Sequence, residues 1–140
     1  MNAQELIIDA LKKNLSGVLE FVDMHLEQAG CSLAEKMKID LAVEEIFINI
    51  ASYAYPKKNG EAVIRVSYSK DPAQVCITFM DRGIPYNPLA RDDPDVTLPA
   101  VKRQIGGLGI FLTKKTMDEV AYEYKDGHNI LKLTKKLQGV

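Results

Sequence analysis

The chain has 140 residues, 46% of them hydrophobic, and its 18 basic and 19 acidic side chains give a net charge of −1 at pH 7. This length suits one domain that buries roughly two-thirds of its unfolded surface, and the balanced charge excludes a global field that would attract nucleic acid or an anionic membrane. The placing of Cys31 and Cys76, with only two histidines, argues against a zinc site or a disulfide framework. We therefore expect a single cytoplasmic domain over residues 1–140, without a signal peptide or a membrane span.

The first half of the chain is predicted to form one strand and two helices. A short strand is predicted over residues 5–11, and apolar spacing predicts a first helix from about 16 to 30. Ser32 and Glu35 have the spacing of a capping box, so a long second helix is expected over 33–55. The same helical spacing predicts core positions for five large side chains: Phe21, Met24, Met37, Tyr53 and Tyr55.

The second half is predicted to form two hairpins separated by a loop and a helix. The elements, in order, are strands over 61–69 and 74–80, a proline-rich loop over 82–105, a helix over 108–117, and strands over 120–125 and 129–137. A loop of this length is typical of a lid, a binding loop or a disordered segment. The order of elements predicts an α+β fold, a two-layer α/β sandwich with helices on one face of a mostly antiparallel, mixed sheet.

Two polar residues lie on the long predicted helix among apolar neighbours. Glu45 and Asn49 are four positions apart and share a face, while apolar residues surround most of the helix between 39 and 51, which predicts burial on several sides. A buried carboxylate and amide need partners, a metal or water. Asn49 is therefore a candidate Mg²⁺ ligand, and Glu45 a candidate general base for a nucleophile. A solvated helix edge is the alternative.

Asp81 opens the sequence DRGIP directly after a predicted strand. Its carboxylate would accept a hydrogen bond from the exocyclic amino group of adenine and repel the carbonyl of guanine, which would select ATP over GTP. The alternative is ordinary turn chemistry. Further along, Lys102 and Arg103 stand where a lid would bring a cation to a terminal phosphate, and Arg is the better geometric match. Solvated surface charge is the alternative for this pair.

Gly106, Gly107 and Gly109 precede or open the predicted third helix. Because an interior glycine costs a helix about 1 kcal/mol, the cluster indicates close backbone approach to another group. The free N–H groups and dipole at a helix start can hold phosphate. The run lacks the Lys-Ser/Thr of a P-loop, and Leu112 stands where a dinucleotide fingerprint needs its third glycine. A tight turn is the alternative.

The three signals occur in order along the chain. E-x-x-x-N at 45–49, D-x-G-x-P at 81–85 and G-G-L-G-I at 106–110 together resemble the N, G1 and G2 boxes of the GHKL ATPases. Nearly the whole chain is similar to the small anti-sigma factor serine kinases of bacteria. The resemblance implies the Bergerat fold, with ATP bound between the helices and the sheet.

The resemblance also implies roles for individual residues. Glu45 would take the general-base position, Asn49 would hold Mg²⁺ and Asp81 would contact adenine. Further nucleotide contacts are expected at Gly83, Arg103, Gly106, Gly107, Leu108, Gly109 and Ile110.

The function implied by the resemblance is to sequester a sigma factor and to phosphorylate a serine of a STAS-domain anti-anti-sigma partner. The implied form is a cytoplasmic homodimer. Tyr53 departs from the histidine that sporulation-type members often carry, which leaves the partner and the kinase rate open. One alternative is a nucleotide-gated binding module without phosphoryl transfer. Another is a detached histidine-kinase catalytic domain, against which His25 lies in an ordinary amphipathic pattern.

Overall fold

The computed structural model describes residues 2–90 and 107–138. The five strands are β1 (Asn2–Asp9), β2 (Glu61–Lys70), β3 (Ala73–Asp81), β4 (Glu119–Lys125) and β5 (His128–Lys136). They form one sheet in the order β1-β2-β3-β5-β4, and each neighbouring pair is antiparallel. The sheet is thus antiparallel throughout the described residues, without the parallel pair that a mixed sheet would contain.

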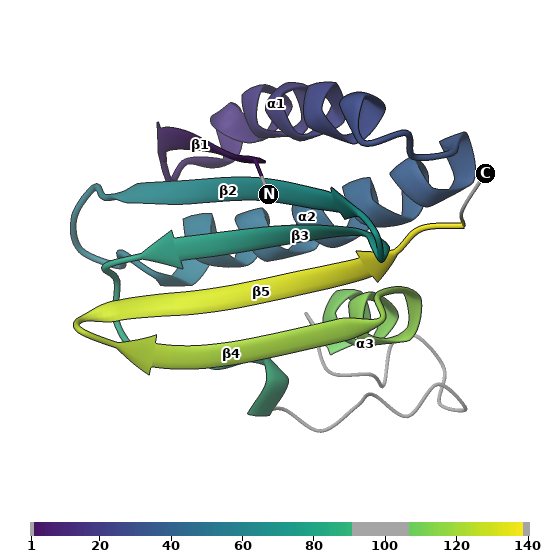
Figure 1. Cartoon of the computed structure of the whole chain (residues 1–140). Coiled ribbons are helices and arrows are strands. Elements are labelled where there is room, and N and C mark those ends of the chain that lie inside the picture. The colour runs from purple at the N-terminus through teal and green to yellow at the C-terminus, as the bar shows by residue number, and fades with distance from the viewer. Residues whose placement is uncertain (1, 91–106, 139–140) are drawn as a thin grey trace.

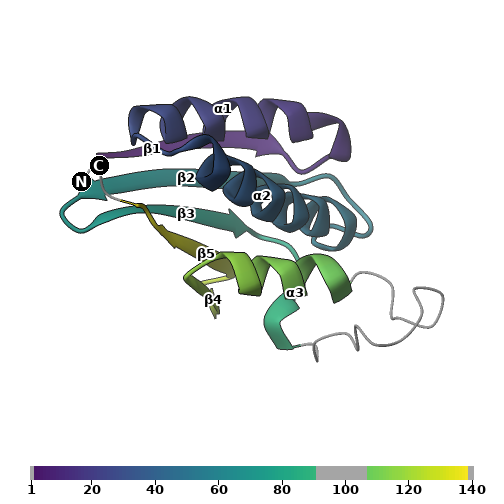
Figure 2. The same ribbon diagram turned by 90° about the vertical axis from the view of Figure 1, so that its right-hand side faces the viewer.

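Three helices cover one face of this sheet (Figures 1 and 2). They are α1 (Leu15–Gln28), α2 (Leu33–Tyr53) and α3 (Gly107–Thr116). Short 3₁₀ turns, η1 (Lys12–Asn14) and η2 (Pro88–Ala90), lie in the connections. The predicted α+β sandwich with helices on one face is therefore confirmed. None of the described helices combines the length and apolar character needed to cross a membrane.

The predicted capping box starts α2. Ser32 Oγ accepts a hydrogen bond from the Glu35 backbone N–H at 3.1 Å, and Glu35 Oε1 accepts one from the Ser32 N–H at 2.8 Å. Glu35 Oε2 also accepts a hydrogen bond from the Gln138 N–H at 2.6 Å. Burial raises the pKa of Glu35, but these hydrogen bonds outweigh it and leave the pKa below its usual value. One carboxylate therefore satisfies the start of α2 and ties the chain after β5 to it.

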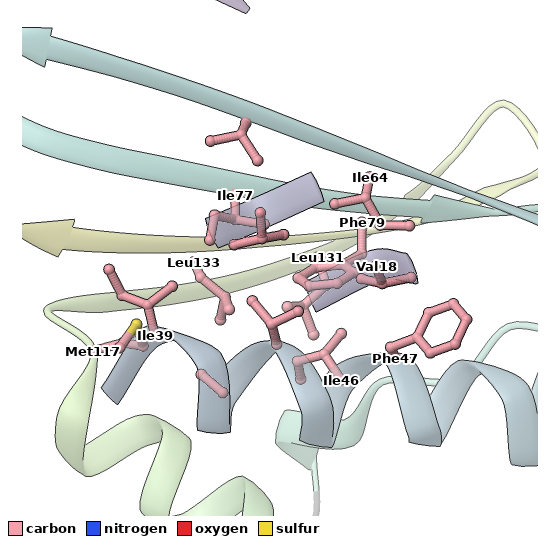
Figure 3. Close-up of a cluster of buried hydrophobic side chains, with 14 of the residues drawn as sticks. Val18, Ile39, Ile46, Phe47, Ile64, Ile77, Phe79, Met117, Leu131 and Leu133 are labelled. Atoms are coloured by element: carbon pink, nitrogen blue, oxygen red, sulfur yellow. The ribbon is translucent and has the colours of Figure 1, made fainter. Parts of the chain in front are cut away.

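The core fills the space between the sheet and α2. On β2, buried side chains at Ala62, Ile64 and Val66 alternate with more accessible ones, as expected for a strand with one covered face. Figure 3 shows side chains from β3 and β5 meeting side chains of α2 in this space. The labelled residues include Ile39, Ile46, Phe47, Ile77, Phe79, Leu131 and Leu133, all of them buried. This packing fixes α2 against the strands from which the site is built.

Three of the predicted core positions are wrong. Met24 is 51% exposed, Met37 59% and Tyr53 48%, whereas Phe21 and Tyr55 are partly buried against the core as predicted. α2 contacts the sheet, α1 and α3, in line with the expected burial on several sides, but Leu41 is 67% exposed on its remaining side. α2 packs on the sheet with its inner side and on α1 and α3 with its flanks, so only its outward side leaves apolar side chains exposed.

Candidate functional site

Asn49 and Asp81 line the same pocket, between α2 and the ends of β3 and β5. Its walls are mainly apolar, with Ile46 and Leu131 among them, and Asn129 adds a third polar group. The cavity volume of the pocket is about 40 Å³, and the empty space reaches about 410 Å³ only when the open solvent at its mouth is included. Apolar walls with a few convergent polar groups are typical of small-molecule sites. The pocket therefore suits a flat, partly apolar ligand with hydrogen-bonding edges.

Asp81 is the last residue of β3 and is only 6% exposed. Its Oδ1 atom accepts hydrogen bonds from the Gly83 N–H and from Asn129 Nδ2, both at 2.9 Å. Burial raises the pKa of Asp81, while these two hydrogen bonds act in the opposite direction. Within the described residues Oδ2 makes no hydrogen bond, so it is available to a donor on a ligand in the pocket.

Asn129 is the site residue that sequence reasoning missed. It pairs with Asp81 across β3 and β5, and its Nδ2 donates to both Asp81 Oδ1 and the Ile84 carbonyl at 2.9 Å. Its Oδ1 accepts hydrogen bonds from the Tyr86 N–H at 3.0 Å and from the Tyr122 hydroxyl. Asn129 therefore holds the carboxylate and the following loop in place. In the sequence it is one letter of the turn DGHN, and only the β3–β5 pairing would have singled it out.

Gly83 allows the loop after β3 to dock on the end of α2. A Cβ atom at this position would lie 2.3 Å from the Ala54 carbonyl oxygen, which is backbone and cannot easily move. The Ile84 N–H donates to the same oxygen at 2.9 Å. The hydrogen bond from the Gly83 N–H to Asp81 is typical of a turn. DRGIP therefore forms a turn and also contributes residues to the pocket, so the two interpretations are compatible.

Glu45 lies one turn before Asn49 on α2, partly buried, and accepts a hydrogen bond from Asn49 Nδ2 at 3.4 Å. Burial raises the pKa of Glu45; the Asn49 hydrogen bond lowers it and the charge of Glu44 raises it further. A Cβ atom on Gly109 would lie 2.1 Å from the carboxyl carbon of Glu45. The carboxylate thus occupies the space that the missing side chain of Gly109 leaves in the first turn of α3.

Glu45 and Gly109 line a second hollow, a groove between α2 and α3. The groove is separate from the pocket of Asn49 and Asp81, and the Glu45–Asn49 hydrogen bond connects the two. The predicted site residues are therefore brought together as two neighbouring pairs. Asn49 belongs with Asp81 in the pocket, and Glu45 belongs with Gly109 in the groove.

The remaining predicted contacts lie at or beyond the start of α3. Gly107 and Leu108 form its first residues, and Ile110 is 4% exposed and belongs to the core. Gly106 and Arg103 lie outside the described residues, as does Lys102.

The residues present fit a single-ligand magnesium site. Within the described residues, no group of three or more His, Cys, Asp or Glu side chains could hold a metal ion. Mg²⁺ usually takes few protein ligands and keeps water and phosphate oxygens. Because Asn49 Nδ2 donates to Glu45, its carbonyl oxygen Oδ1 is the atom left to face the pocket. An oxygen in this position is the ligand type that Mg²⁺ prefers.

Comparison with known proteins places this geometry in context. Residues 8–135 match the Histidine kinase-like ATPase domain family. Serine-protein kinase RsbW of Staphylococcus aureus (strain bovine RF122 / ET3-1) is 25% identical over 137 residues, covering 94% of this chain and 80% of the relative. The protein of the same name in strain Newman is 24% identical. The crystal structure of the RsbU and RsbW domains of a Mycobacterium tuberculosis protein is similar in fold, with a TM-score of 0.69 at 16% identity. The match covers 98% of this chain and 33% of that chain.

Proposed function

The chain belongs to the histidine kinase-like ATPase domain family, and from this premise we propose that it binds ATP and transfers the γ-phosphoryl group to a serine of a protein partner. Residues 1–140 act as one ATP-binding domain in this proposal. The supporting observation is that Asn49 and Asp81, which come from different elements, line one pocket whose mainly apolar walls carry a few convergent polar groups.

Asp81 is proposed to select adenine. Its Oδ2 atom accepts a hydrogen bond from the exocyclic amino group, while Oδ1 remains held by Asn129 and Gly83. A guanine carbonyl in the same position would face a carboxylate without a donor between them, which costs binding free energy. The apolar walls supply contact area for the purine ring.

Asn49 and Glu45 are proposed to serve the transfer. Asn49 Oδ1 is the protein ligand of Mg²⁺, which when bound neutralises phosphate charge. Glu45 accepts the proton of the serine hydroxyl as its oxygen attacks the γ-phosphorus and ADP departs. Burial raises the pKa of this carboxyl, which makes Glu45 a stronger base than an exposed glutamate. The backbone at Gly107, Leu108, Gly109 and Ile110, with Gly106 and Arg103 before it, is proposed to contact the phosphates.

The partners are proposed from the relatives named serine-protein kinase RsbW. The chain would sequester a sigma factor. It would also phosphorylate a STAS-domain anti-anti-sigma protein, which would then dissociate from this chain. We propose a cytoplasmic homodimer that makes no direct contact with nucleic acid, since the net charge of −1 provides no general attraction to it.

The test is transfer of label from γ-labelled Mg·ATP to a STAS-domain protein encoded beside this gene. Wild type is expected to label a serine of that protein, and Glu45→Gln is expected to lose turnover by 10²-fold or more while still binding ATP. Glu123→Gln, an exposed glutamate on β4, is the matched control and should retain full turnover. ATP binding by wild type without any label on the partner would instead indicate a nucleotide-gated binding module. Label on a partner histidine would favour a histidine-kinase catalytic domain.

A further inference from the structure

The outer side of α2 carries a row of exposed apolar side chains. Leu33 is 73% exposed, Met37 59% and Leu41 67%, and their spacing of four residues places them along one helix face. Exposed apolar residues scattered singly are normal on protein surfaces, but a contiguous row indicates an interaction site. We call these three side chains the α2 stripe.

The α2 stripe runs into the groove between α2 and α3. Leu41 is both its last member and a lining residue of the groove, where Ile48 from α2 and Leu112 from α3 add apolar surface. Leu112 is itself 50% exposed. The two helices lie next to each other on the same face of the sheet (Figure 2). The groove has a volume of about 400 Å³, enough for side chains of a bound segment.

Glu45 lies on the wall of this groove and not in the nucleotide pocket. A serine hydroxyl must come within hydrogen-bond reach of the general base, so the acceptor has to enter from the groove side. Asn49, one turn away, lines the pocket and bonds to Glu45. ATP would thus enter from the pocket and the protein substrate from the groove. The two would meet at the Glu45–Asn49 pair.

We infer that the groove and the α2 stripe bind the segment of the protein substrate that carries the phosphorylated serine, and that this segment has apolar residues next to the serine. The inference rests on the proposed kinase function and names the docking surface and the substrate class. The apolar members of the surface contact apolar flanking side chains, while Glu45 receives the hydroxyl. The acidic pair Glu44 and Glu45 in the groove disfavours acidic residues close to the serine.

The test measures phosphorylation kinetics as a function of the concentration of the neighbouring STAS-domain protein. Leu41→Ser combined with Leu112→Ser is expected to raise KM for this protein about tenfold, with KM for ATP unchanged, because the substitutions remove contact area far from the nucleotide. Both side chains are at least half exposed, so the fold should tolerate the change. Ile7→Ser is the matched control, since Ile7 is 61% exposed on β1, at the edge of the sheet and away from the groove, and should leave both KM values unchanged.

The outcomes separate this inference from the function on which it rests. An active wild type with the same KM for its partner in the double variant would overturn the docking surface and leave the kinase function standing. A change from dimer to monomer in the double variant, with that KM unchanged, would also overturn it, because a second copy would then cover the surface. A wild type that neither binds nor labels the STAS-domain protein would remove the proposed function and this inference together.

Replacement of the residues that flank the serine in the partner gives a second measurement. Exchange of apolar neighbours for aspartate is expected to raise KM by a similar factor with wild type. The KM of the double variant should rise less on this exchange, because the surface that contacts the residues next to the serine is already lost. Equal responses of the two proteins would contradict the inference.

Discussion

The Asp81 carboxylate has a structural role through Oδ1 and a proposed ligand-binding role through Oδ2. Oδ1 is fully engaged by Asn129 and the Gly83 N–H, whereas Oδ2 has no bond within the described residues. We expect Asp81→Asn to weaken ATP binding roughly tenfold to a hundredfold, since a charge-assisted hydrogen bond contributes about 1.5–3 kcal/mol. Calorimetric titration with ATP and with GTP measures this, and the preference for ATP should shrink. An unchanged ratio of the two affinities would remove the proposed role in base selection.

Gly109 should matter for Glu45 and much less for stability. A Cβ atom at 109 would meet the carboxyl group of Glu45, the mobile end of a flexible side chain. Gly109→Ala is therefore expected to displace the carboxylate and lower kcat at least tenfold. The free energy of unfolding should change by less than about 1 kcal/mol, because alanine favours the helix by a similar amount. Phosphorylation rates and urea unfolding of the same preparation test both parts. A large loss of stability with a normal kcat would contradict this account.

Single residues differ in how far their roles can be predicted from sequence. Glu45, Asn49 and Asp81 could be chosen as candidates because each motif has a chemical logic within a few neighbouring residues, and their roles stay predictions. Asn129 could not, because its role depends on pairing with Asp81 across two strands. The sequence also did not predict that Glu45 lies outside the pocket of Asn49, because this depends on where α3 packs against α2.

At the scale of elements, local signals predicted the helices and strands well. The capping box at Ser32, the strand alternation and the turn at 126–127 all act within a few residues, so their sequence signature is direct. The inner and outer faces of α2 were harder to predict. Its apolar residues occur nearly all round the helix, and only the packed structure distinguishes buried Ile39 and Phe47 from exposed Met37.

The contact between α1 and α2 contains a pair of carboxyl groups that should make stability depend on pH. Asp23 on α1 and Asp40 on α2 each bury an Oδ1 atom without a donor among the described residues. Burial first, and then the hydrogen bond and charge of Asp23, raise the pKa of Asp40 from 3.8 to about 7, while Lys36 lowers it. Lys36 itself pairs with Glu27 at 3.2 Å, which weakens its effect on the carboxyl pair. A proton on Asp40 would let its carboxyl group donate a hydrogen bond to Asp23 and would satisfy both atoms.

The sign of this pH effect follows from proton binding. Between pH 3.8 and about 7 the folded chain holds a proton on Asp40 that the unfolded chain has lost, so the free energy of unfolding falls as pH rises through this window. Asp40→Asn keeps a neutral partner at every pH. Allowing for solvent screening of a half-exposed pair, the variant should be about 1 kcal/mol more stable than wild type at pH 8, with little difference at pH 4. Urea unfolding at both pH values tests this. A variant less stable than wild type at pH 8 would show that the ionised Asp40 is not destabilised by its surroundings, which would contradict the raised pKa.

At the scale of the whole molecule, the antiparallel sheet brings the end of β3 next to the start of β5, and side chains of α2 line one pocket with residues of both strands. The pocket is open space between layers that are otherwise packed, so ligand binding and global stability should be linked. The order of elements predicted these layers because few topologies accommodate it. The position of α3, which determines the groove, depends on tertiary packing that local signals do not encode.

This linkage gives a test of Asn49 that uses stability instead of turnover. A ligand at a hundred times its dissociation constant adds about 2.7 kcal/mol to the free energy of unfolding, which for a chain of this size corresponds to a rise in Tm of roughly 8–12 °C. We expect wild type to show such a rise with ATP and Mg²⁺, and a smaller one with ATP and a chelator. Asn49→Ala should have a near-normal Tm without ligand, since Asn49 is not fully buried, and should lose the magnesium-dependent part of the rise. Asn59→Ala, an exposed position before β2, is the control and should respond like wild type. If Asn49→Ala retained the full response to Mg²⁺, the metal would be held by other groups, and the role proposed for this amide would be wrong.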